Sequence, residues 1–223
     1  MATNARIAPS ILSADFSILG DEVRRAEAGG ADIIHVDVMD GHFVPNLTIG
    51  PLVVDSLRPV TGLELDVHLM IEKPWEYIPE FAKAGADSIT IHIETCPEPE
   101  DVIQQIHDLG KRAGITLCPG TPLETIKKVA AMVERVLIMS VEPGFGGQSF
   151  MPDQLEKART LVAWRQQDGH HYDIQIDGGI KAHNARECAE AGVEVFVAGS
   201  AVFDADDYQT SIAELRASAL GDR

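Results

Sequence analysis

Residues 31–46 read ADIIHVDVMDGHFVPN, and this stretch places two ionisable side chains, His35 and Asp37, inside an apolar segment. The branched apolar residues of the segment are Ile33, Ile34, Val36 and Val38. Such residues favour a β-strand that is buried on both faces. A charge inside a buried strand is costly unless it is paired or bound to a metal. The stretch therefore predicts either a buried polar pair or a functional site.

Similar apolar segments recur along the chain and alternate with segments of helical composition. The predicted strands are residues 6–12, 32–39, 63–70, 87–94, 114–119, 135–141, 173–179 and 193–200. The predicted helices are residues 16–30, 51–58, 75–86, 101–114, 122–134, 153–167, 184–192 and 208–220. Because strands alternate with helices, we expect the strands to pair in parallel.

Eight strand–helix units in 223 residues predict an α/β protein with a closed (β/α)8 TIM barrel, formed as a single domain over residues 1–223. The alternative is an open, doubly wound sheet of six to eight strands. In a barrel the active site lies at the C-terminal ends of the strands. Polar residues late in the predicted strands are therefore the candidates for a site.

The composition narrows the classes of function. A net charge of -17 argues against a nucleic-acid partner, because phosphate backbones bind clustered Lys and Arg. No apolar run approaches about 20 residues, so we expect no membrane partner, and the first residues lack the pattern of a signal or transit peptide. Cys96, Cys118 and Cys188 lie far apart, which argues against a disulfide framework and favours a cytoplasmic location. We also expect a homo-oligomer.

Four side chains of metal-ligating type lie late in three predicted strands: His35, Asp37, His68 and Asp177. Residues two apart in a strand point to the same side, so these groups should meet at one rim of the barrel. Two nitrogen and two oxygen donors suit Zn²⁺, with Fe²⁺, Mn²⁺ or Co²⁺ as alternatives. Buried histidines and structural ion pairs are the other interpretation, since no local motif such as HExxH marks a metal.

Three glycine-rich segments follow the last three predicted strands. They are VEPGFGGQSF (141–150), DGGI (177–180) and AGSAVF (198–203). Gly-rich turns expose backbone N–H groups that bind anions, and a phosphate site after the last strands recurs in barrels. Residues 141–150 contain no Lys or Arg, so the backbone would hold the phosphate. Ordinary tight turns are the alternative.

Asp37 and Asp177 come from distant strands and could flank a substrate on opposite faces. One carboxylate could remove a proton from a carbon and the other could return a proton on the far side, which inverts a stereocentre. The carbon should adjoin a carbonyl, so that a metal stabilises the developing enediolate. The alternative is that both aspartates are ligands only.

Three methionines, Met39, Met70 and Met139, end predicted strands near the same rim. A flexible, polarisable side chain there could cover a planar intermediate and exclude water. Filling of the core is the alternative for each methionine.

The chain resembles the ribulose-phosphate 3-epimerase (pentose-5-phosphate 3-epimerase) family over nearly its full length. The resemblance is carried by IAPSILSADF, HVDVMDGHFVPNLTIGP, DVHLMIEKP, VEPGFGGQSF, IDGGI and AGSAVF. It implies a TIM barrel of the ribulose-phosphate-binding type. It also implies a metal-dependent isomerase that interconverts D-ribulose 5-phosphate and D-xylulose 5-phosphate in the pentose phosphate pathway or Calvin-type carbohydrate metabolism.

The resemblance also assigns roles to residues. Asp37 would be the proton acceptor and Asp177 the proton donor, with their roles exchanged in the reverse direction. His35, Asp37, His68 and Asp177 match the metal ligands, with one divalent ion per subunit. The residues that match substrate contacts and the phosphate cradle are Ser10, His68, Gly144, Phe145, Gly146, Gly147, Gly178, Gly179, Gly199 and Ser200.

One position departs from the family pattern. Glu142 stands where the family more often carries Asn, and it either weakens phosphate binding or faces solvent. His92 and Glu94 lie at the same predicted rim and are candidates to support the ligands from behind, without an assigned role, and we expect His183 to lie at the surface.

Two other functions stay open, and a further one is disfavoured by the sequence. An epimerase of a related ketose phosphate such as allulose 6-phosphate is the nearest rival. A phosphosugar decarboxylase would want a Lys among its strand-end carboxylates, which HVDVMD lacks. A non-catalytic barrel that binds a sugar phosphate is the second function that stays open.

Overall fold

The computed structural model describes residues 5–221 and contains eight β-strands. The strands are β1 (Arg6–Pro9), β2 (Ile33–Met39), β3 (Glu64–Met70), β4 (Ser88–His92), β5 (Arg112–Leu117), β6 (Arg135–Met139), β7 (Asp173–Asp177) and β8 (Val195–Ala198). They form one parallel sheet in the order β1-β8-β7-β6-β5-β4-β3-β2. A parallel bridge between Ser10 and His35 joins the two edges. The predicted TIM barrel is confirmed.

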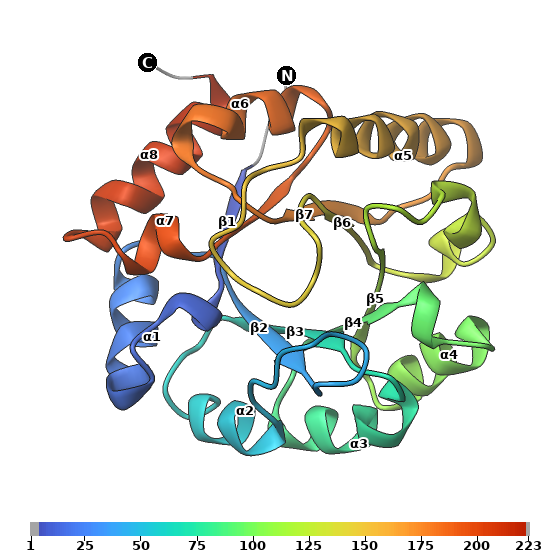
Figure 1. The fold of residues 1–223 in the computed structure, drawn as a ribbon, viewed down its shortest axis with the longest axis horizontal. Coiled ribbons are helices and arrows are strands. Elements are labelled where there is room, and N and C mark those ends of the chain that lie inside the picture. The colour runs from blue at the N-terminus through green and yellow to red at the C-terminus, as the bar shows by residue number, and fades with distance from the viewer. Residues whose placement is uncertain (1–4, 222–223) are drawn as a thin grey trace.

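Helices surround the strands in Figure 1. They are α1 (Leu19–Ala28), α2 (Pro51–Leu57), α3 (Pro74–Ala84), α4 (Pro99–Asp108), α5 (Leu155–Asp168), α6 (Ala182–Glu190), α7 (Ser200–Phe203) and α8 (Tyr208–Leu220). Proline begins α2, α3 and α4, where its missing N–H leaves no helix hydrogen bond unmade. Gly85 ends α3 with a φ of 106°, a left-handed conformation that glycine adopts easily.

The segment 122–134, predicted as one helix, is the clearest difference from the sequence-based expectation. It forms two 3-10 turns, Leu123–Ile126 and Ala130–Met132. Leu123, Ile126 and Val129 are buried. A spacing of three residues matches the 3-10 turn, whose side chains align at every third position. The first strand is also shorter than predicted and is followed by a 3-10 turn at Ile11–Ser13.

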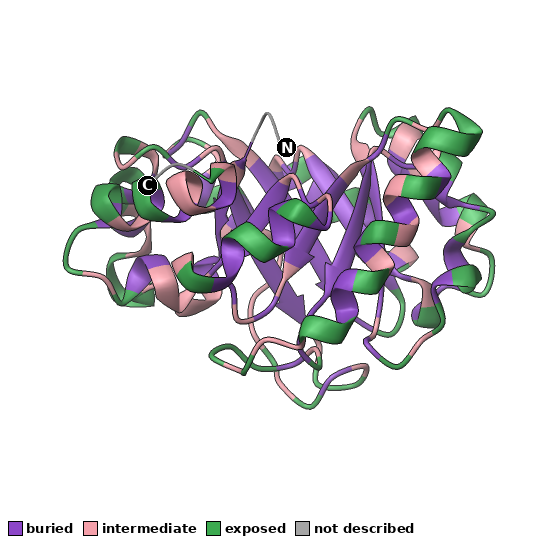
Figure 2. Cartoon of the chain, turned by 90° about the horizontal axis from the view of Figure 1, so that it is seen from above, coloured by how far each residue is buried: buried purple, intermediate pink, exposed green. Residues whose placement is uncertain are grey.

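The main hydrophobic core lies between the outer face of the barrel and the helices. Branched side chains such as Val67, Ile89 and Ile174 point outward from their strands into this layer. The strands are almost entirely buried in Figure 2, whereas the helices alternate buried and exposed faces. Alternation along each strand therefore sends the other half of the strand residues into the barrel interior.

The N-terminal end of the barrel interior holds a network of ion pairs. Arg135 is 1% exposed and its guanidinium lies 2.9 Å from Glu64 and 2.8 Å from Asp66. Asp173 pairs with Arg6 at 2.7 Å and with Arg112 at 3.2 Å. The carboxylates raise the pKa of Arg135 although burial lowers it. Because each buried charge has an opposite partner, the interior can be polar without isolated charges.

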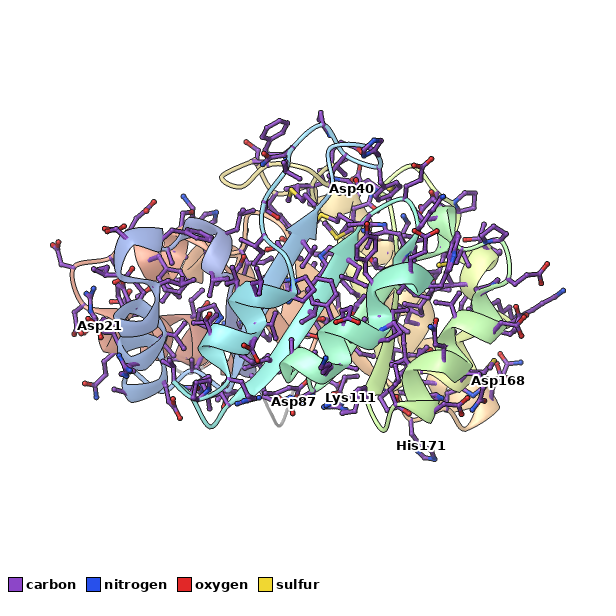
Figure 3. All side chains as sticks on the ribbon, turned by 90° about the horizontal axis from the view of Figure 1, so that it is seen from below. Asp21, Asp40, Asp87, Lys111, Asp168 and His171 are labelled. Atoms are coloured by element: carbon purple, nitrogen blue, oxygen red, sulfur yellow. The ribbon has the colours of Figure 1, made fainter. Side chains whose placement is uncertain are left out.

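The two ends of the barrel differ in what they carry. Asp87 and Lys111, which precede β4 and β5, lie at one end, and Asp40, which follows β2, lies at the other (Figure 3). The loop of residues 140–151 crosses the barrel mouth in Figure 1. Among the described residues, no helix has the length and apolar character that crossing a membrane requires.

Close packing inside the barrel predicts that adding a side chain at Gly114 on β5 lowers the stability of the fold. A Cβ atom there would lie 2.1 Å from Oγ1 of Thr90 and 3.2 Å from its Cα. We expect Gly114→Ala to lower the free energy of unfolding by about 1–3 kcal/mol, measured by urea denaturation. Gly120, with open space around its Cβ position, is the control, and Gly120→Ala should change stability by less than about 0.5 kcal/mol. Equal stabilities would contradict the tight packing of β4 against β5.

Candidate active site

A cavity of about 570 Å³ opens at the C-terminal end of the barrel. It is lined by every residue predicted to contact the substrate except His68, and also by Asp37 and Asp177. The loops after β1, β6, β7 and β8 form its walls. His35 and His68 are fully buried beside it.

The four predicted metal ligands come together beside this cavity. Ligand atoms of His35, Asp37, His68 and Asp177 all lie within 4.8 Å of one another. The Oδ1 atom of Asp37 is 3.3 Å from Nε2 of His35 and 3.1 Å from Nδ1 of His68. The side chains converge because β2 and β3 pair in register, Asp37 opposite His68, and β7 faces them across the barrel.

His35 is oriented by a partner below it. Its Nδ1 lies 2.8 Å from Oδ2 of Asp66, and its Nε2 has no hydrogen-bond partner among the described residues. A carboxylate on one imidazole nitrogen fixes the ring and makes the other nitrogen a better ligand. Burial lowers the pKa of His35, but the charges of Asp37 and Asp66 raise it well above its usual value. In the metal-free protein a proton on His35 thus supplies positive charge that a metal would replace.

His68 is held between Asp37 and a second histidine. Its Nδ1 faces Asp37, and its Nε2 lies 2.9 Å from Nε2 of His92 on β4. Burial lowers the pKa of His68 to about 4. The ring is therefore neutral at physiological pH, which is the state that binds a metal. His92 is a neighbour of the site that sequence reasoning left without a role.

The two aspartates differ in their preferred protonation states. Burial raises the pKa of Asp37, but the positive charge of His35 and the contact with His68 lower it far below its usual range. Burial and the negative charge of Asp37 raise the pKa of Asp177 to about 7. A pair of carboxyl groups with pKa values displaced in opposite directions supplies one base and one acid. Ser10 also donates its hydroxyl hydrogen bond to Asp37.

The glycine-rich segments meet along one side of the cavity. Gly144, Gly178 and Gly179 have positive φ values of 129°, 126° and 65°. A Cβ atom at Gly179 would lie 2.6 Å from the backbone nitrogen of Phe150. The hydroxyl of Ser140 donates to the carbonyl of Gly178. Loops packed this closely, backbone against backbone, can present their N–H groups to an anion.

The cavity is also lined by two basic side chains, Lys181 and His183, which the sequence does not assign to the site. His183 is exposed, as expected, and it lies on the cavity wall. Lys181 directly follows the DGGI segment, and this position was the available signal for a basic group near the phosphate loops. Glu142 is exposed, as one of the two alternatives for it required.

The three methionines are buried and also line the cavity. Met39 and Met70 pack together with Val44, and Met139 packs with Leu137 and Val141. The structure thus places each methionine both in a small apolar cluster and against the cavity wall.

Comparisons with known proteins agree over the length of the chain. The model of the Ribulose-phosphate 3 epimerase family matches residues 6–203. Ribulose-phosphate 3-epimerase of Synechocystis sp. is 52% identical over 220 residues, which cover 98% of this chain and 96% of the relative. The protein of the same name from Bacillus subtilis is 50% identical over 214 residues, covering 96% of this chain and 99% of the relative.

More distant solved structures share the fold alone. KGPDC from Streptococcus mutans superposes with a TM-score of 0.71 at 12% identity, covering 98% of this chain and 99% of the other. The 3-keto-L-gulonate-6-phosphate decarboxylase of Vibrio cholerae gives a TM-score of 0.71 at 16% identity, with 99% and 100% covered. At these identities the likeness supports the barrel and carries no argument about the reaction.

The raised pKa of Asp177 predicts a pH-dependent effect in chelator-treated, metal-free protein. Because the folded state binds this proton more tightly than the unfolded state, ionisation of Asp177 lowers stability as the pH rises from about 4 to about 7. Asn cannot ionise, so metal-free Asp177→Asn should gain stability relative to the wild type across this interval. Urea denaturation of both proteins at several pH values measures the difference. A difference that does not change with pH would contradict the raised pKa.

Proposed function

The chain belongs to the ribulose-phosphate 3-epimerase family and is an isomerase, and from this premise we propose how its site performs the reaction. Ribulose 5-phosphate and xylulose 5-phosphate differ in configuration at C3, the carbon beside the C2 carbonyl. The observation that carries the proposal is the Asp37–Asp177 pair, two carboxyl groups from distant strands that line one cavity and whose pKa values are displaced in opposite directions in the metal-free protein.

The ionised Asp37 is the base that removes the C3 proton of ribulose 5-phosphate. Removal leaves negative charge that spreads onto the C2 oxygen, so the carbon becomes planar. The protonated Asp177 then donates its proton to C3 from the opposite face, and the configuration is inverted. In the reverse direction the two residues exchange roles. Positioned acids and bases of this kind contribute about 10²–10⁴-fold each to a rate.

The residues fit a divalent cation. Nε2 of His35 is buried without a hydrogen-bond partner among the described residues, and it faces the same centre as Nδ1 of His68 and both carboxyl groups. A bound cation would supply positive charge against the negative charge that develops on the substrate oxygens. Two nitrogen and two oxygen donors favour Zn²⁺, with Fe²⁺, Mn²⁺ and Co²⁺ as alternatives.

The remaining predicted residues bind the rest of the substrate. The backbone N–H groups of residues 144–147, 178–179 and 199–200 hold the phosphate. Ser10 contacts the sugar oxygens, whereas His68, fully buried and outside the cavity lining, acts through the metal site. Met39, Met70 and Met139 cover the planar intermediate and exclude water. The lining of a single cavity by all these residues except the buried His68 supports this arrangement.

Other aspects of the protein stay predictions. An allulose 6-phosphate epimerase uses the same chemistry, and turnover on the two substrates separates the activities. A non-catalytic barrel would bind the sugar phosphate without turnover, and the opposed pKa values of Asp37 and Asp177 favour catalysis. The unpaired state of Cys96, Cys118 and Cys188 is compatible with a cytoplasmic location. The homo-oligomer is also a prediction.

The two-base mechanism predicts different isotope patterns for the two aspartate variants in D₂O. Asp177→Asn leaves Asp37 to remove and return a proton on one face, so deuterium should enter C3 of ribulose 5-phosphate with little xylulose 5-phosphate formed. Asp37→Asn should instead exchange C3 of xylulose 5-phosphate. NMR of the sugars measures both, and metal analysis of each variant controls for loss of the ion. Near-normal turnover by Asp177→Asn would contradict the mechanism.

The phosphate site predicts a binding effect at Gly146. A Cβ atom there would lie 3.8 Å from Leu12 and 3.9 Å from Ser13, two residues that line the cavity. We expect Gly146→Ala to raise KM with little change in kcat, since the methyl group occupies space near the non-reacting phosphate. Glu142→Asn in the same loop is the control and should leave KM unchanged, because Glu142 is exposed. An unchanged KM for Gly146→Ala would remove this loop from the phosphate site.

A further inference from the structure

Two buried histidines face each other behind the metal-ligand group. Nε2 of His68 lies 2.9 Å from Nε2 of His92, and the rings are stacked with centroids 5.0 Å apart. Both side chains are fully buried. At this distance one nitrogen must carry a proton and the other must accept it, because two N–H groups would repel and two lone pairs would form no bond. The hydrogen-bond partner of the other ring nitrogen of His92, Nδ1, therefore determines which of the two facing nitrogens carries the proton.

Glu94 is the hydrogen-bond partner of Nδ1 of His92. Its Oε2 lies 3.3 Å from Nδ1 of His92, while its Oε1 accepts the backbone N–H of Cys118 at 2.7 Å and the hydroxyl of Thr121 at 2.5 Å. Burial raises the pKa of Glu94, but the hydrogen bonds it accepts lower it to about 2. An ionised carboxylate only accepts hydrogen bonds. His92 therefore donates its Nδ1–H to Glu94, and Sγ of Cys118, which lies 3.9 Å from the same nitrogen, can accept from it as well.

The hydrogen-bond roles of His92 and His68 then follow from the acceptor role of Glu94. A neutral His92 with its proton on Nδ1 has a lone pair on Nε2, which accepts the Nε2–H of His68. With its proton on Nε2, a neutral His68 presents a lone pair on Nδ1, the nitrogen that faces Asp37 and the proposed metal. Asp37 alone would favour the opposite tautomer, because its Oδ1 lies 3.1 Å from Nδ1 of His68 and would accept a proton there.

We propose that His92 and Glu94 are positioning residues that hold His68 in the Nε2–H tautomer, so that its Nδ1 binds the divalent cation of the epimerase. This inference rests on the metal site of the proposed function. Groups that hydrogen-bond to ligating histidines typically contribute about 10–100-fold to metal affinity. His92 and Glu94 thus act on the reaction through His68 and do not touch the substrate.

The trio His92, Glu94 and Cys118 could instead hold a second ion, since its ligand atoms also lie within 4.8 Å of one another. One observation favours the positioning role. A cation on Nδ1 of His92 would leave the proton on Nε2, directly opposite the Nε2–H of a metal-bound His68.

Glu94→Gln tests the inference because Gln has nearly the same shape as Glu but can present an NH₂ donor to His92 where Glu presents an acceptor. The amide oxygen of Gln must face the backbone N–H of Cys118, which turns its NH₂ group toward His92. His92 then accepts at Nδ1 and carries its proton on Nε2, and His68 is driven to the Nδ1–H tautomer that cannot bind the metal. We expect Co²⁺ to bind this variant about 10–100-fold more weakly than the wild type, measured by chelator competition with full-length protein.

Glu134→Gln is the matched control, since Glu134 also pairs with a histidine, His107 at 3.1 Å, and likewise accepts a backbone N–H, from Ala113. It should leave Co²⁺ affinity unchanged. The thermal stability of metal-free Glu94→Gln should equal or exceed that of the wild type, because the reversed tautomer of His68 also donates to Asp37. If the substitution only disrupted packing, the metal-free variant would instead be less stable than the metal-free wild type.

A measurement on the wild type alone keeps the inference falsifiable if Glu94→Gln does not fold. In the zinc-loaded protein, ¹⁵N NMR should find the proton of His92 on Nδ1. A proton on Nε2 of His92, wild-type Co²⁺ affinity in Glu94→Gln, or two bound ions per chain would overturn the positioning role and leave the proposed function standing. A wild-type protein that binds no divalent ion would overturn the metal site as well.

Discussion

The buried carboxylate of Asp66 is the interaction on which the rest of the site depends. It is fully buried, and it receives hydrogen bonds from Ser88, from Gln175 on the far side of the barrel, and from the guanidinium of Arg135. Its remaining contact is Nδ1 of His35. Because these partners come from different strands, Asp66 ties the interior together and fixes the ring that presents Nε2 to the ligand group.

The arrangement above Asp66 follows from the same strand geometry. Residues two apart along β2 and β3 point inward, so β2 supplies His35 and Asp37 to the site, while β3 supplies Asp66 to the polar interior and His68 to the site. Closing the barrel then brings Asp177 on β7 to Asp37 on β2. Two carboxyl groups forced together cannot both ionise easily, and the histidines on one side decide that Asp37 is the ionised member. In the metal-free protein one electrostatic conflict therefore leaves one carboxyl group ionised and the other protonated, and a divalent cation at the same centre would add positive charge beside both.

The sequence was sufficient for the barrel and for the convergence of His35, Asp37, His68 and Asp177, because both depend on strand order and on two-residue alternation. It was insufficient where the outcome depends on side-chain orientation or on short-range packing. In residues 122–134 the buried side chains recur every three residues. This spacing is close to that of an α-helix, so the sequence pattern does not distinguish the observed 3-10 turns from a helix. The contact between His68 and His92 depends on the rotamers of two rings on neighbouring strands, and nothing in either strand specifies those rotamers.

The most direct test of the account follows C3 in the unmodified protein. Metal-stripped protein is incubated with ribulose 5-phosphate in D₂O, zinc is restored, and NMR records the hydrogen at C3. The account predicts that xylulose 5-phosphate forms only with metal and carries deuterium at C3, because Asp177 donates a solvent-derived proton. Product that keeps the original hydrogen at C3 would contradict the two-base mechanism, and a folded, zinc-loaded protein that leaves the sugar unchanged would contradict the assignment of the site.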